Sequence, residues 1–372
     1  MTIKTKFLTL ATLTLSLGIT SCSNDKDNES VSDGLNKNVF LKIENPISNT
    51  RAESNPETAG TVDFNKGYLY FTASNGFIEK YVEIVAKGET TEEQINIEEL
   101  QTGHNFKNLP AATAHVYIVG NTELDVKSGL IASVRNTNLT INSQADFKNV
   151  NLYGMNTLKK VDGTDSDYKT NVLVAPTVSR LEIGGIKSKG DVIESFEVEG
   201  VFVDNYVMQS DVEGTIDEAD VTSGGDNPDF FVPGTEVFPT ELNKIIYDWY
   251  PETEHLASAK DGEYQAVKPT GENRIWGYNV FAKKTSNIAP TIIIRLQNVK
   301  YAGGQVITTP LFLTAKLKGI TELEPGKIYT IGKDGIIFDE TNLSPDPNAK
   351  SIDAEVTVTL AVWDKVELEI EF

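Results

Sequence analysis

The chain has 372 residues, and its 33 Lys and Arg against 54 Asp and Glu give a formal net charge of −21 at pH 7. This length favours two domains behind a removable leader, and so acidic a chain repels phosphate backbones, which excludes nucleic-acid binding. With Cys22 as its single cysteine and three scattered histidines, the chain is expected to hold no internal disulfide, no metal site, no cofactor and no catalytic residue.

The first predicted element is an N-terminal leader. Two lysines precede an apolar stretch over residues 7–19, which is too short to cross about 30 Å of hydrocarbon as a stable anchor. We interpret residues 1–21 as a signal peptide. The stretch ends in an aliphatic residue, two small residues and Cys22, an order that resembles the lipobox of bacterial lipoproteins. A chance cysteine after an ordinary signal peptide is the alternative.

Lipid on Cys22 would be the chain's contact with a membrane. Stable attachment needs more than one acyl chain, so we expect diacylation, with palmitate as a typical chain. No other segment of the sequence is apolar enough to span a bilayer. The polar, acidic residues 23–29 fit either a solvated linker or the surface-export signal that such lipoproteins carry in the Bacteroidetes.

An isolated strand follows the leader. Val39, Leu41 and Ile43 alternate with Phe40, Lys42 and Glu44. This alternation predicts a strand with the three aliphatic residues on one face. The next residues, 45–60, are rich in Asn, Pro, Ser, Thr and Gly and are expected to form an exposed loop. Within this loop lies the Arg51-Ala52 junction. The other four arginines adjoin apolar strand candidates, so a trypsin-like, Arg-specific protease should cut after Arg51 first.

Short strands dominate the rest of the chain, which predicts an all-β fold of two sandwich domains in tandem. One helix is expected, over Thr90–Leu100. A fresh alternating run over Val172–Ile183 places the domain boundary near Ala175. The other expected strands are Gly67–Ala73, Ile78–Ala86, His115–Val119, Leu130–Val134, Leu139–Ile141, Val150–Tyr153, Val192–Asn205, Ile275–Phe281, Thr291–Tyr301, Thr309–Leu317 and Lys327–Ile331.

Two alternating segments stand in tandem in the last twenty residues. One face of the first carries Val356, Val358, Leu360 and Val362, and one face of the second carries Val366, Leu368, Ile370 and Phe372, opposite Glu367, Glu369 and Glu371. An apolar strand face must be buried, and a free edge invites pairing with another chain. Ordinary final strands of the second domain are one interpretation. The sequence stops on an apolar residue with no polar tail, which favours donor strands that insert into a neighbouring copy.

Together these features resemble the fimbrillins, the major fimbrial subunits of Bacteroidetes-type (type V) pili. The resemblance covers nearly the whole chain and rests on the order and spacing of several phrases. These are the lipobox ending in Cys22, the Arg51-Ala52 junction, LPAATAHVYIVGN at Leu109–Asn121, the segment Gln144–Gly154 ending VNLYG, VSRLEIGGI from Val178, and the tandem strands around Trp363.

The resemblance implies a division into a signal peptide (1–21), a lipidated propeptide with the first strand (22–51), two transthyretin-like β-sandwich domains (52–174 and 175–352) and a donor-strand segment (353–372). It implies an outer-membrane lipoprotein precursor and, after the cut at Arg51, a cell-surface fimbrium that supports cell adhesion. The groove left by the first strand is expected to accept a terminal strand of another copy. Partners are therefore copies of the chain and other fimbrial subunits.

Other functions stay open on the sequence. A surface lipoprotein that binds glycan or a host protein would use Tyr247, Trp249 and Tyr250 as an aromatic platform, although such clusters are more often core. A minor or tip subunit of the same pilus is a related alternative. An enzyme is not expected, because no nucleophile elbow, P-loop or dinucleotide-binding motif is present. The acids of the run DGTDSDY from Asp162 suggest calcium only weakly, since the EF-hand order is missing.

Overall fold

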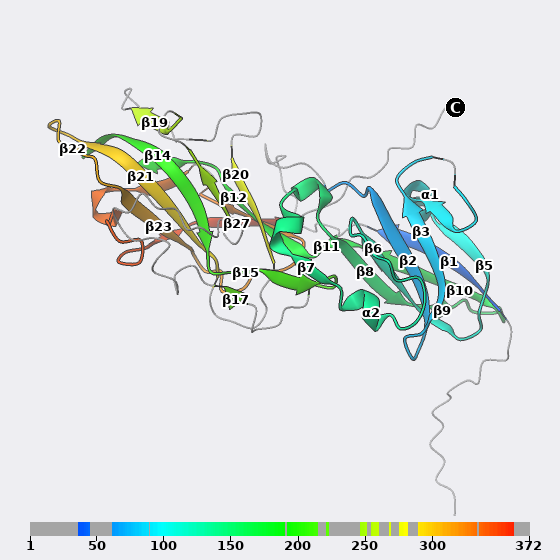
Figure 1. The fold of residues 1–372 in the computed structure, drawn as a ribbon. Helices are drawn as coiled ribbons and strands as arrows, with labels where there is room; N and C mark the ends of the chain where they lie inside the picture. Colours follow the sequence, from blue (N-terminus) through cyan, green and yellow to red (C-terminus); the bar gives the residue numbers. More distant parts are fainter. Residues whose placement is uncertain are drawn as a thin grey trace, which may run out of the picture. The chain divides into compact units, whose positions relative to one another are not determined.

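The computed structural model describes residues 36–44, 62–88, 90–189, 192–214, 221–222, 246–250, 254–259, 268, 275–281, 289–332 and 335–360, which belong to one compact unit (Figure 1). Cys22 and the Arg51-Ala52 junction lie outside these residues. So do five of the predicted donor residues, Val362, Val366, Leu368, Ile370 and Phe372.

Strands up to residue 176 form two sheets. The first has four strands in the order β5-β1-β10-β9, and the second has six in the order β11-β8-β6-β2-β3-β4. The bounds are β1 Lys37–Glu44, β2 Lys66–Ala73, β3 Ile78–Val85, β4 Gln94–Asn96, β5 His104–Leu109, β6 Thr113–Gly120, β8 Leu152–Thr157, β9 Lys159–Lys160, β10 Asp167–Leu173 and β11 Ala175–Pro176.

Strands from residue 178 onwards form two further large sheets, ordered β20-β12-β24-β27 and β18-β14-β21-β23-β26, with β19 beside β14 and β22 beside β21. Their bounds are β12 Val178–Ile183, β14 Ile193–Asp204, β18 Ile246–Trp249, β19 Leu256–Ala259, β20 Trp276–Phe281, β21 Thr291–Tyr301, β22 Val306–Ile307, β23 Leu311–Leu317, β24 Lys327–Ile331, β26 Ile352–Ala354 and β27 Val356–Leu360. The expected all-β class is confirmed. The boundary near Ala175 stays a prediction.

Three two-stranded pairings complete the sheets. β7 (Asn138–Thr140) pairs with β16 (Gln209–Asp211), so a segment far along the chain lies against the strands of the first half. The other two pairings are β13 (Ile186–Ser188) with β25 (Ile336–Phe338), and β15 (Tyr206–Val207) with β17 (Val221–Thr222).

Aromatic side chains connect the facing sheets. Phe71 of β2 meets Phe106 of β5 edge-on, with ring centroids 4.9 Å apart. Phe196 of β14 meets Phe338 of β25 in the same way at 5.2 Å. Offset and edge-on ring pairs of this kind add to the stability that their burial gives. The core between facing sheets is thus built from the side chains that point inward from each strand.

Helices are few, and here two expectations are wrong. The helix α1 is Ile97–Thr102, not Thr90–Leu100, because Gln94–Asn96 pairs with β3 as a short strand. Residues 130–134 are not a strand: α2 is Ala132–Arg135, and Leu130 makes only a single bridge, to Phe77. A short apolar run does not distinguish helix from strand by periodicity alone. The 3₁₀ turns are η1 Ile141–Gln144, η2 Phe147–Asn149 and η7 Glu340–Asn342.

Candidate functional site

The first strand within the described residues is an interior strand of its sheet. β1 runs parallel to β10, with Leu41 opposite Thr170, and antiparallel to β5, with Leu41 opposite His104. Backbone hydrogen bonds extend to the start of β1, where the Asn38 amide donates to the carbonyl of Ser166 at 2.8 Å. β1 therefore fills a slot between two strands that do not otherwise meet.

The apolar face of β1 is part of the core. Val39 and Leu41 are fully buried and Ile43 is nearly so. Complete burial of such side chains contributes about 1.5–3 kcal/mol each, so the three together stabilise the fold by roughly 5–9 kcal/mol as an upper estimate. Removing β1 would open a groove of matching depth and leave two strand edges without partners.

Neither neighbour of β1 is joined to it by a hairpin. β5 begins 60 residues after β1 ends and β10 more than 120 residues after it. The strand is therefore held in the sheet by packing and by hydrogen bonds, with a covalent link only through the residues that follow Glu44. A cut in that link would leave β1 as a separate peptide, held only by these noncovalent contacts. The predicted cut site at Arg51 lies in this stretch and outside the described residues.

The first of the two tandem C-terminal segments has a partner in its own chain. β27, which holds Val356, Val358 and Leu360, pairs antiparallel with β24 at the edge of its sheet. The interpretation as an ordinary strand thus holds for these three residues, and a donor role for them is not supported. Val358 is 40% exposed, and within the described residues β27 pairs with a strand on one side only. The donor interpretation remains for the five residues that lie beyond residue 360.

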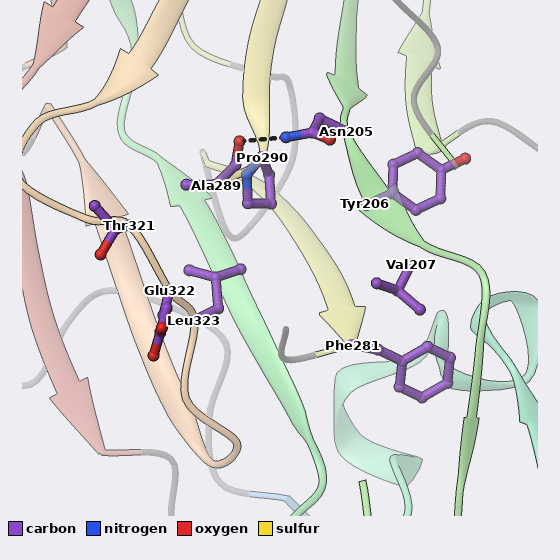
Figure 2. A pocket seen from close by; sticks show the side chains of 9 residues that line it. All are labelled: Asn205, Tyr206, Val207, Phe281, Ala289, Pro290, Thr321, Glu322 and Leu323. Carbon is purple, nitrogen blue, oxygen red and sulfur yellow. Dashed lines mark hydrogen bonds between the residues drawn. The ribbon is translucent and has the colours of Figure 1, made fainter. Parts of the chain in front are cut away.

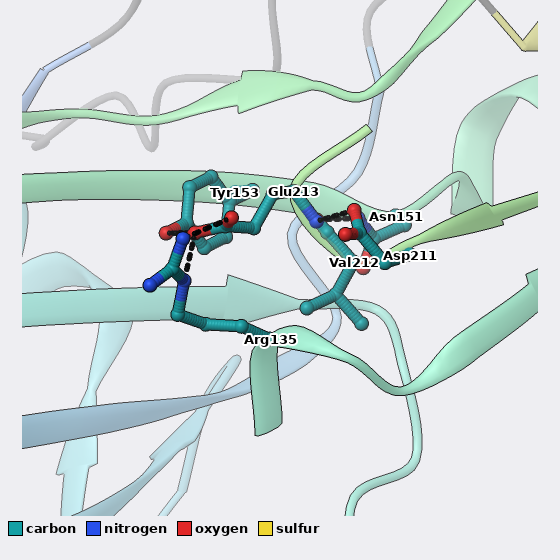
Figure 3. A network of polar contacts seen from close by, with 6 residues as sticks. All are labelled: Arg135, Asn151, Tyr153, Asp211, Val212 and Glu213. Atoms are coloured by element: carbon teal, nitrogen blue, oxygen red, sulfur yellow. Dashed lines mark hydrogen bonds and ion pairs between the residues drawn. The ribbon is translucent and has the colours of Figure 1, made fainter. Parts of the chain in front are cut away.

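A polar network fixes the segment that follows β16 (Figure 3). The Arg135 guanidinium donates twice to the Glu213 carboxylate, from Nε at 2.5 Å and from the second terminal nitrogen at 2.7 Å. The Tyr153 hydroxyl donates to the same carboxylate. Bidentate, charge-assisted bonds of this kind are among the stronger polar contacts in proteins. The pairing joins side chains 78 residues apart, which no local pattern predicts.

Burial and hydrogen bonding act in opposite directions on this carboxylate. Burial alone would raise the pKa of Glu213, but the hydrogen bonds from Arg135 and Tyr153 outweigh it and lower the pKa below its usual value. Burial, and then the bond to Glu213, raises the pKa of the Tyr153 phenol. Nearby, Asn151 donates to the Val212 carbonyl at 2.9 Å, in the buried interior. The network is structural in character, since its groups satisfy one another.

The aromatic cluster is divided between two places, since Tyr247 and Trp249 belong to β18 and Tyr250 follows it. Tyr247 stacks on Phe202, with centroids 6.1 Å apart, and Trp249 lies under the Arg295 guanidinium at 5.4 Å. Tyr250 packs against the main core instead, where its hydroxyl accepts from the Trp276 indole at 2.7 Å. A single platform of three rings is therefore wrong.

One cavity lies between strands of the second half, lined by Asn205, Tyr206, Val207, Phe281, Ala289, Pro290, Thr321, Glu322 and Leu323 (Figure 2). Its volume is about 10 Å³, the room that one water molecule needs. Asn205 closes one side by donating to the Ala289 carbonyl at 2.9 Å. The cavity has no room for a sugar or another organic ligand.

The described residues offer no further ligand centre. Within them, no three His, Cys, Asp or Glu side chains are placed to share a metal ion, and Asp167 of the DGTDSDY run accepts a hydrogen bond from Asn38 at 3.0 Å. No helix in these parts of the chain is long and apolar enough to span a membrane. The slot occupied by β1 is thus the feature of the described residues that chiefly points to a function.

Comparisons with known proteins place the fold. A protein of Parabacteroides distasonis assigned to cell adhesion matches with a TM-score of 0.51 at 12% identity, over 90% of this chain and 98% of that one. One from Bacteroides eggerthii, with the same assignment, has a TM-score of 0.49 at 15% identity, over 89% and 97%. A fimbrilin of Porphyromonas gingivalis has a TM-score of 0.49 at 12% identity, over 89% of this chain and 99% of that one. The chain shares its fold with the Parabacteroides protein.

The matches are structural. No protein-family model matches the chain, and no curated protein matches it in sequence. The structures to which the chain is similar include a fimbrilin and cell adhesion proteins. At these identities the likeness concerns the fold, and a function has to be argued from this chain's own residues.

Proposed function

We propose that the chain is a structural, non-enzymatic stalk subunit of a surface fimbria. In this proposal it is exported as an outer-membrane lipoprotein precursor through Cys22, and an Arg-specific protease cuts after Arg51. The new N-terminus is Ala52. The cut subunits then polymerise by donor-strand exchange on the cell surface and support adhesion.

The position of β1 carries the proposal. It is an interior strand with a buried apolar face, its neighbours are distant in sequence, and the polar stretch of sequence that follows it contains Arg51. A strand needed by the mature fold would not be expected beside an accessible cut site. A strand that keeps an acceptor groove closed until the cut fits this arrangement.

The segment Val366–Phe372 has the composition to refill the groove. Its alternation repeats the spacing of Val39, Leu41 and Ile43, with four inward side chains in place of three. Their burial would contribute roughly 6–12 kcal/mol as an upper bound, and each backbone bond a further 0.5–1.5 kcal/mol, approximately. Strand addition of this kind holds chains together without covalent links. Because donor and acceptor are different surfaces, the contact does not close on itself and yields a filament.

The binding-module alternative loses its main support. Tyr250 faces the core, and the cavity beside β15 holds one water at most. A tip subunit would have no use for a donor strand, so the second tandem segment favours a position within the stalk.

Digestion of the purified chain with an Arg-specific protease tests the proposal. Electron microscopy should show fibres after digestion, and mass spectrometry of those fibres should show Ala52 as the first residue. The variant Arg51→Ala is the matched control and should stay intact and monomeric. Fibres built from chains that still contain residues 37–44 would refute the proposal.

A further inference from the structure

The four strands of the sheet around β1 are rich in lysine, in an otherwise acidic protein. The four strands of this sheet hold six lysines against two carboxylates, Glu44 and Asp167, while the whole chain carries a net charge of −21. Three of these lysines stay with the subunit after β1 has gone and point away from the core: Lys107 on β5, Lys169 on β10 and Lys159 on β9. We call these three the lysine row.

The pairing registers place Lys107 and Lys169 on the two strands that border the slot, and Lys159 one strand further out. Lys169 lies directly opposite Phe40 of β1, and Lys159 lies directly opposite Lys169 on the other side. On the far edge of the slot, Lys107 follows Phe106, the inward-facing partner of Val39. All three lysines are exposed. Any strand in the slot therefore has lysines on both sides of its outward face.

No ion pair within the described residues involves the lysine row. Acids on this face have other partners: Asp167 accepts from Asn38 at 3.0 Å and Glu44 from Asn171 at 2.9 Å. Like charges directly opposite each other on neighbouring strands, as at Lys159 and Lys169, are destabilising. The lysine row is thus left without a carboxylate partner among the residues of its own four strands.

β1 does not balance the charge of the lysine row. Its outward residues beside the row are Phe40, which is 38% exposed, and Lys42, a further cation. The strand that fills the slot in the uncut chain is therefore a poor electrostatic match for its neighbours.

We propose that the lysine row binds the glutamates of the segment Val366–Phe372 from a second copy of the chain, and so selects this segment as the donor. The inference rests on the proposed function and adds the recognition element to it. With the apolar residues of the segment facing inward, the period of two puts Glu367, Glu369 and Glu371 on the outer face. This holds for either strand direction and for every register that keeps the apolar face inward.

The same criterion discriminates between the two tandem segments. In the first segment, the residues that alternate with the valines are Glu355, Thr357, Thr359 and Ala361, so only one end is charged. The second segment presents three carboxylates in a row. Replacement of β1 by this segment exchanges Lys42 for a glutamate between the strands that hold Lys107 and Lys169.

Charge reversal on the two sides tests the proposal. The acceptor variant is Lys107→Glu with Lys159→Glu and Lys169→Glu. Its control reverses three exposed lysines elsewhere that have no ion pair within the described residues: Lys87→Glu, Lys148→Glu and Lys316→Glu. The donor variant is Glu367→Lys with Glu369→Lys and Glu371→Lys, and a fourth chain combines donor and acceptor changes. After Arg-specific digestion, sedimentation at 50 mM and 500 mM NaCl gives the subunit concentration at which half is in fibres.

At 50 mM salt the acceptor variant should need about tenfold more subunit than the control, which is the combined effect of reversing three exposed charges, two of them on strands that border the slot. The difference should shrink at 500 mM, because salt screens exposed charges. The combined chain should return to within about twofold of wild type. An acceptor variant that matches its control at both salt concentrations would overturn the proposal while the proposed function stands. Wild-type chain that stays monomeric throughout would overturn the proposed function itself. If the triple acceptor variant fails to fold, the single variant Lys169→Glu replaces it, with Lys148→Glu as its control. The expected difference in subunit concentration is then smaller.

Discussion

Leu41 of β1 and Thr170 of β10 are direct partners in a parallel register, and both side chains are buried although 129 residues separate them. Parallel strands need a long connection, so this pair forms only when the sheet assembles as a whole. The consequence is that β1 can leave without unthreading any hairpin. It is a core strand that the proposed function requires to be removable.

The first prediction concerns the stability of the uncut chain. Leu41→Ala removes a fully buried side chain and should lower the free energy of unfolding by about 2–5 kcal/mol. Lys42→Ala, on the outward face of the same strand, should change it by less than about 0.5 kcal/mol. Urea denaturation of the two uncut variants makes the comparison. After the Arg51 cut and removal of the peptide, all variants should melt alike, and a persisting difference would mean that β1 has not left.

The second prediction separates the two C-terminal segments. A chain lacking residues 366–372 should keep its melting temperature and lose polymerisation, since this segment is proposed to serve a neighbour. A chain lacking residues 356–372 should also lose stability, because β27 pairs with β24 along five residues of its own sheet. Thermal melts and a sizing column run on the cut proteins distinguish these outcomes. Multimer ladders from the shorter truncation would show that residues 366–372 are not the donor.

Acid sensitivity follows from the network at Glu213. Because the folded-state pKa of this carboxyl lies below its usual value, its contribution to stability is present above the unfolded pKa and is lost as the pH falls through the folded one. Arg135 is 42% exposed, so we expect only about 1 kcal/mol after solvent screening. Wild type should therefore lose more stability between pH 6 and pH 3 than Glu213→Gln does. Denaturation curves at the two pH values give the difference, and equal losses would contradict the assignment.

A structural role for Tyr250 gives the fourth prediction. Tyr250→Phe removes the acceptor of the buried Trp276 indole and should destabilise the chain by about 1–2 kcal/mol. Fibre formation after the cut should not change. Tyr301→Phe is the control, since its hydroxyl makes no hydrogen bond within the described residues, and it should be close to neutral. A folded Tyr250→Phe chain that loses adhesion but no stability would favour the binding-module alternative.

Much of the fold could be predicted from the sequence because its strands alternate clearly. Val39, Leu41 and Ile43 predict β1, and each of the three faces the core. The strands that hold β1 were not predicted. β5 has only Phe106 and Leu109 as apolar residues, and a bulge at Asn108, with a φ of 58°, interrupts its alternation. β10 begins at Asp167, within the run DGTDSDY, whose acids do not favour a strand.

The remaining features depend on contacts between distant residues. Arg135 and Glu213 carry no local signal of their pairing, and the lysine row appears only when three strands are placed side by side. Single-sequence periodicity reports which face of a strand is buried, but not which strand lies next to it. Recognition elements built across a sheet are therefore the part that needed the structure.

A photo-reactive residue at position 171 tests the central claim most directly. In the uncut chain Asn171 lies opposite Lys42, on the outward face of β10. A cross-linker there should react with residues 37–44 of its own chain before digestion. In fibres assembled from a mixture of isotopically labelled cross-linker chains and unlabelled chains, it should react with residues 361–372 of a different copy. Cross-links in the fibres that still lead to residues 37–44, or that lead to no C-terminal residue, would contradict donor-strand exchange at this groove.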